Sequence, residues 1–215
     1  MPGRGRAVLE AVRFAAAVAS SPSGVVTLWK TATGGNVVGC LPATPIAELP
    51  HAAGLLPIAL ESEEDLSLLS GRIDAWMVGP DPPPFPVSPA MIPRFAFPRQ
   101  PPGSVEEALD RVEALAEWAS AVSGSPASEG ALWKSLRAYA TRRSLLAALA
   151  ERCARETAFL GTEERRDIVR AGIFLPPDAH SLLLASILGL DHEPASVPAE
   201  EERGDPLIVL AKRLM

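Results

Sequence analysis

Two patterns of hydrophobic positions divide the chain. In its first half, short apolar runs rich in β-branched residues alternate with short segments of helical or loop character. The runs occupy 36–41, 55–60, 73–78 and 92–97. This alternation is typical of βαβ units, so we expect four parallel strands in one sheet.

Helical spacing of apolar residues dominates elsewhere. Residues 6–20 predict an amphipathic helix that ends at the breaker Ser20-Ser21-Pro22. Ser104 and Glu107 form a capping box that opens a helix reaching 123, where Gly124 supplies the stop. The pattern predicts further helices over 128–156, 162–171, 177–188 and, capped by Asp205, to 215.

These elements predict an α/β protein in which a small parallel sheet domain of the Rossmann or flavodoxin type precedes a helical region. We place an N-terminal helix and the parallel α/β domain in 1–103, the helical region in 104–190, and an acidic linker with a C-terminal helix in 191–215. Many of the 22 prolines cluster in 80–102 and 194–206, and these clusters mark the joints.

Composition and charge exclude several classes of protein. With 20 Lys and Arg against 26 Asp and Glu the net charge is −6, and the basic residues are scattered, which argues against binding nucleic acid. The apolar stretches fall short of the roughly 20 residues that cross a bilayer, so we expect no membrane span. Two cysteines without close spacing indicate no disulfide framework, as in a reducing cytoplasm.

Polar motifs offer little chemistry on their own. The histidines His51, His180 and His192 lie far apart without metal-ligand spacing, so a structural or surface role is favoured for each. The glycine-rich stretch 33–36 precedes a strand and therefore indicates a turn, since a phosphate loop follows its strand. Aromatic residues are expected in the core, with Trp118, Trp133 and Tyr139 on helices and Trp29 and Trp76 in or beside strands.

One segment carries a more specific motif. Residues 37–58 read VVGCLPATPIAELPHAAGLLPI: a strand, a turn, a helix ended by Gly54, and a second strand. This segment resembles the opening of the subunits of 2-hydroxyacyl-CoA dehydratases and benzoyl-CoA reductases. Three later segments of the chain also resemble segments of that family, in the same order: FAFPR at 95–99, LRAYATRRSLL at 136–146 and RDIVRAG at 166–172. The resemblance covers about 36–190, and HAAG and VRAG are its most specific signatures.

The chain departs from the family where the family binds its [4Fe-4S] cluster. Family cysteines from separate segments ligate that cluster, one of them in the turn after the first strand in many subunits. Pro42 stands there in this chain, while Cys40 lies two residues earlier and Cys153 lies on a predicted helix. The segment between the second strand and 95 is shorter than in the family, and after 190 we expect an acidic linker and a helix in place of the family's second α/β domain. The resemblance thus implies no cofactor bound by the chain alone, and a cluster only through a partner subunit.

Three functions are compatible with this resemblance. The first is a non-catalytic or accessory subunit that pairs with a full-length family subunit, or with itself, in the acyl-CoA dehydration or reduction of anaerobic metabolism. The second is a catalytic subunit with an acyl-CoA thioester site, in which Glu48 matches a family acid and acts as the acid–base group. The alternative role for Glu48 is structural: a carboxylate in the first turn of a helix interacts favourably with the helix dipole. The third is an unrelated accessory or assembly factor that reuses the fold. We expect no activity from the chain alone.

Overall fold

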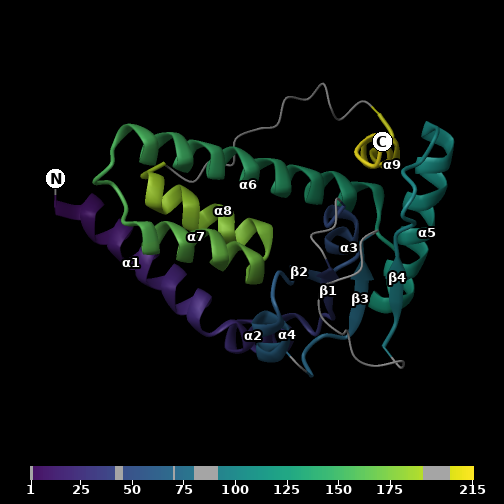
Figure 1. The fold of residues 1–215 in the computed structure, drawn as a ribbon, viewed down its shortest axis with the longest axis horizontal. Helices are drawn as coiled ribbons and strands as arrows, with labels where there is room; N and C mark the ends of the chain where they lie inside the picture. Colours follow the sequence, from purple (N-terminus) through teal and green to yellow (C-terminus); the bar gives the residue numbers. More distant parts are fainter. Residues whose placement is uncertain (1, 42–45, 70, 80–91, 191–203) are drawn as a thin grey trace. The chain divides into compact units, whose positions relative to one another are not determined.

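A computed structural model describes residues 2–41, 46–69, 71–79, 92–190 and 204–215 (Figure 1). Contacts group the chain into two compact units: unit 1 comprises Met1–Val25 and Arg137–Val197, and unit 2 comprises Val26–Leu136 and Pro198–Met215. The three-part division drawn from the sequence stays a prediction.

The elements are α1 (Pro2–Ser20), α2 (Pro22–Thr33), β1 (Val37–Leu41), α3 (Glu48–Ala52), β2 (Leu56–Ala59), α4 (Glu63–Leu68), β3 (Ala75–Val78), β4 (Arg94–Ala96), α5 (Val105–Ser123), α6 (Glu129–Arg155), α7 (Thr162–Phe174), α8 (Pro177–Leu188) and α9 (Pro206–Lys212).

Unit 2 contains a parallel sheet with the strand order β2-β1-β3-β4. Every residue of β1 and β3 is buried, as expected for inner strands covered on both faces, whereas the edge strand β4 is largely exposed. Gly39 of β1 lies under Trp76 of β3, and a Cβ at Gly39 would lie 2.4 Å from that ring. The predicted fold class, a small parallel α/β sheet with a helical region, is confirmed.

The main core of unit 2 combines the sheet with α3, α5, α9 and the start of α6. The strands contribute Val38 and Cys40 from β1 and Met77 from β3. Helix α9 packs on α5, and its Leu210 and Ala211 are fully buried. The C-terminal helix is therefore part of the core of this unit.

Unit 1 is helical. Helix α1 packs against α7 and α8, and the residues it buries are apolar: Val12, Ala15, Val18 and Ala19. Helices α7 and α8 also pack against each other. No single helix in the described part of the chain is long and apolar enough to cross a membrane, although α1 and α2 taken together, with a sharp bend between them, pass the same test of length and composition.

Three predicted helix-end residues lie where the sequence places them, whereas α7 continues past the predicted end at 171 to Phe174 and α9 ends at Lys212 and not at 215. Ser104 accepts a hydrogen bond from the backbone N–H of Glu107, Gly124 ends α5 in the left-handed region, and Asp205 caps α9. The carboxylate of Glu107 bonds the N–H of Gly103, one residue before the position that a capping box requires. Only half of the predicted capping box is thus formed.

Helix α2 corrects the sequence analysis. Pro22 was interpreted only as the end of the first helix, but it also occupies the first turn of the next helix, where proline needs no hydrogen-bond partner. Trp29 therefore lies on a helix and not in or beside a strand, and its ring covers Gly35, where a Cβ would lie 2.4 Å from the ring. The predicted turn after 33 is confirmed, with Gly34 at a φ of 67°.

Candidate functional site

The carboxyl edge of the sheet is where this topology places a ligand site. The chain runs from β1 outward to β2 and then crosses to β3 and β4, so the strand order reverses between β1 and β3. Open parallel sheets bind ligands outside the carboxyl ends of strands at such a point. The segments 42–45 and 80–91, which follow these two strands, lie outside the described residues, and so does the predicted cluster position at Pro42. Helix α3 follows β1 at this edge.

Glu48 is the first residue of α3 and is 3% exposed. Its Oε1 accepts a hydrogen bond from Nη1 of Arg213, the residue that follows α9. A buried carboxylate needs such a charged partner, because burial without one is costly. The predicted place in a first helical turn is confirmed. The carboxylate is thus buried and engaged with Arg213 in this structure.

Ser135 and His51 form a second contact on α3. The Ser135 hydroxyl donates to the carbonyl oxygen of Glu48 at 2.7 Å, and Nδ1 of His51 lies 2.9 Å from the same hydroxyl oxygen. Because the serine proton is directed at a carbonyl, Nδ1 must carry the proton and donate. A serine nucleophile requires the opposite direction, with histidine accepting the serine proton. This pair therefore ties the start of α6 to α3, a structural role.

The two thiols are withdrawn from the surface of their units. Cys40, the next-to-last residue of β1, is 2% exposed, and Cys153 is buried on α6 in unit 1. In the described ranges, no group of three or more His, Cys, Asp or Glu side chains could hold a metal ion. His192 lies outside those ranges.

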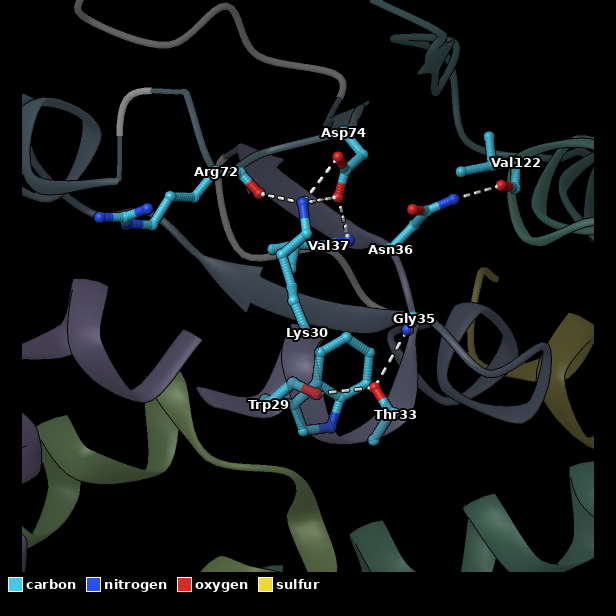
Figure 2. A network of polar contacts seen from close by, with 9 residues as sticks. All are labelled: Trp29, Lys30, Thr33, Gly35, Asn36, Val37, Arg72, Asp74 and Val122. Atoms are coloured by element: carbon cyan, nitrogen blue, oxygen red, sulfur yellow. Dashed lines mark hydrogen bonds and ion pairs between the residues drawn. The ribbon is translucent and has the colours of Figure 1, made fainter. Parts of the chain in front are cut away.

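A polar network occupies the amino edge of the sheet (Figure 2). Lys30 of α2 contacts both carboxylate oxygens of Asp74, at 2.8 and 2.7 Å, and the carbonyl oxygen of Arg72 at 3.2 Å. Asp74 also accepts the N–H of Val37, the first residue of β1, at 2.8 Å. Sequence spacing does not reveal this network, because its members lie far apart in the chain and only the aspartate before the β3 strand hints at it. Ligands bind at the other edge, so we assign it a structural role.

His180 of α8 is a buried histidine with a lowered pKa. It is 1% exposed, its Nε2 lies 2.9 Å from the carbonyl oxygen of Ile168, and burial lowers its pKa to about 4. A Cβ at Gly172 of α7 would lie 2.3 Å from the ring. The glycine of the VRAG signature thus leaves room for this histidine. The predicted structural role of His180 agrees with these contacts.

An open cavity lies in unit 2 between the start of α6 and the start of α9. Glu129 and Leu132 line it from α6, and 204–207 line it from the other side. The carboxylates of Glu129 and Asp205 would repel the phosphates of an acyl-CoA. This cavity is therefore a poor candidate for a thioester site.

No family model matches the chain, and no curated protein matches it in sequence.

Proposed function

We propose that the chain is a non-catalytic or accessory subunit, resembling those of 2-hydroxyacyl-CoA dehydratases and benzoyl-CoA reductases. It would pair with a cluster-bearing subunit in acyl-CoA dehydration or reduction in the cytoplasm. The motifs at 37–58 and 166–172 support the resemblance: the first spans β1, α3 and β2 of the parallel sheet domain, and the second lies on α7. Because no family model and no curated protein matches the chain, the proposal rests on those motifs.

The position of Cys40 is the observation that carries the accessory role. Its side chain packs in the core of unit 2 with Val38 and Met77, so the thiol nearest to the family's ligand position is buried inside the sheet layer. A [4Fe-4S] cluster generally takes about four ligands, and the chain has two cysteines, each buried. Cluster chemistry would then belong to the partner.

Anaerobic purification with iron analysis and a visible spectrum tests this role. We expect no stoichiometric cluster and no dehydratase or reductase activity from the chain alone, and activity only when a full-length family subunit is added. The variant Cys153→Ser serves as the control for Cys40→Ser. A stoichiometric brown cluster that is lost in Cys40→Ser and kept in Cys153→Ser would overturn the proposal.

The place of Glu48 in a family motif favours a second candidate, a catalytic subunit in which this carboxylate is the acid–base group. Glu48→Gln and Arg213→Met, each mixed with a cluster-bearing partner, separate the two roles. A catalytic Glu48 predicts that Glu48→Gln abolishes turnover while Arg213→Met retains it. The accessory role predicts that both variants lower stability and partner binding together. Flanking genes that encode neither a full-length subunit nor an ATP-dependent activator would favour an unrelated assembly factor.

A further inference from the structure

In unit 1 the imidazole of His180 on α8 contacts Ile168 and Gly172 of α7. Nε2 of His180 faces the carbonyl oxygen of Ile168, so Nε2 must carry the ring proton. In the neutral ring Nδ1 is then an acceptor, and this buried atom has no hydrogen-bond partner among the described residues. The geometry therefore selects one neutral tautomer and leaves nothing to receive a second N–H.

The surroundings of the ring leave no room for a compensating group. Gly172 lies so close that even a methyl group there would collide with Cε1 and Nδ1 of His180. The carbonyl of the same glycine accepts a hydrogen bond from Arg142 at 3.1 Å, which places a guanidinium beside this contact. A proton on Nδ1 would create a buried, unpaired donor and a second positive charge close to the first.

Among the described residues of unit 1, the other charged groups are exposed or engaged elsewhere. On α7, Asp167 lies 3.7 Å from Arg166, and Arg170 stacks over a phenylalanine ring and donates to a carbonyl of α1. Asp178 of α8 is exposed and lies two positions from His180, nearly opposite on the helix. Helix α1 buries only apolar side chains, and its described charged residues are exposed. Arg142 of α6 is thus the charge that acts on the ring, and it repels a proton.

We propose that the α7–α8 pair is an acid-sensitive lock: the neutral ring of His180 holds the two helices together, and its protonation separates them and uncovers the apolar face of α1. The ring can accept the proton only where Nδ1 meets water, which requires the helices to part. This inference concerns regulation of unit 1 and does not depend on the proposed function.

The direction of the pH dependence follows from linkage. The folded pKa of His180, about 4, lies below its ordinary value of 6.5. Above pH 6.5 the ring is neutral in both the closed and the opened state, and the lock is at full strength. As the pH falls from 6.5 toward 4, only the opened state binds the proton, so the closed state loses up to roughly tenfold in relative population per pH unit.

Hydrogen exchange of the intact protein, followed by mass spectrometry between pH 7.5 and 4.5 and corrected for intrinsic rates, tests the lock. We expect protection of α7 and α8 to fall by up to roughly tenfold per pH unit below 6.5, with α5 of unit 2 as internal reference. His180→Gln keeps a donor for Ile168 but cannot be protonated, so its α7–α8 protection should stay level relative to α5. His51→Gln, the same change at a histidine of unit 2, should keep the wild-type slope.

Equal pH slopes in α7–α8 and α5 of the wild type, or equal slopes in the wild type and His180→Gln, would overturn the proposal. If His180→Gln does not fold, the histidine ring signals of the wild type decide the matter by NMR. A His180 signal that titrates near 6.5 while α7 and α8 stay protected would equally refute the lock.

Discussion

At the scale of single residues, two glycines of the signature motifs are needed for different physical reasons. Gly54 follows α3 with a φ of 82°, and a Cβ there would meet no atom within 4 Å. Gly172 has an ordinary helical backbone, but its missing side chain makes room for His180. The first glycine is required by backbone strain and the second by packing, so they should respond differently to substitution.

Gly54→Val should lower the free energy of unfolding by roughly 1 kcal/mol or more, because a β-branched residue in the left-handed region is strained. Gly54→Asn should cost less, since asparagine tolerates that region. Chemical denaturation of the three proteins measures the order. Unchanged stability in Gly54→Val would contradict the role of this glycine in the HAAG motif.

Gly172→Ala should destabilise the protein by about 1–3 kcal/mol, because the new methyl group displaces the His180 ring from Ile168. Gly130→Ala is a matched control in helix α6, where a Cβ meets nothing within 4 Å, and it should be neutral or stabilising by up to about 1 kcal/mol. In denaturant titrations the double variant Gly172→Ala/His180→Ala should lose less free energy of unfolding than the two single variants lose in sum. Additive losses would show that the two residues are not coupled.

At the scale of elements, local patterns in the sequence were sufficient for most of the fold. The four strands follow from apolar runs, and α5 follows from Ser104 and Gly124, because these signals act within a few residues. Helix α2 was missed because its valines and threonines favour strands and because Pro22 both ends one helix and begins the next.

The contacts around the candidate site could not be predicted in the same way. Glu48 and Arg213 are separated by 165 positions, and His51 and Ser135 by 84. Periodicity indicates which face of a helix is buried, but it does not say which distant helix packs there. The sequence thus placed Glu48 in a first helical turn and could not supply its partner.

The network that joins α2 to the amino edge of the sheet gives a prediction at this scale. Asp74→Ala should cost about 2 kcal/mol, because it removes the acceptor of both Lys30 and the Val37 N–H. Lys30→Met should cost under about 1 kcal/mol, since the Lys30–Asp74 ion pair is partly exposed and Asp74 still accepts the hydrogen bond from the Val37 N–H. Urea denaturation measures both. Equal losses would mean that the bond to Val37 contributes nothing.

At the scale of the whole molecule, each unit is assembled from segments far apart in the chain. Leu210 of α9 completes the core of unit 2, and Leu184 of α8 is fully buried in unit 1. Leu210→Ala and Leu184→Ala should each cost about 2–5 kcal/mol. In hydrogen exchange, Leu210→Ala should lower the protection of α5, and Leu184→Ala should lower the protection of α7. Loss of protection in both units from either change would show that they unfold as one.

The burial of α9 against α5 also sets an order of events during synthesis. The apolar surface of α5 that α9 packs on leaves the ribosome well before Leu210 and Ala211 of α9 exist. At the usual rates of translation this interval is on the order of ten seconds. During that time the nascent chain presents an uncovered apolar stripe, which is the kind of surface that chaperones bind.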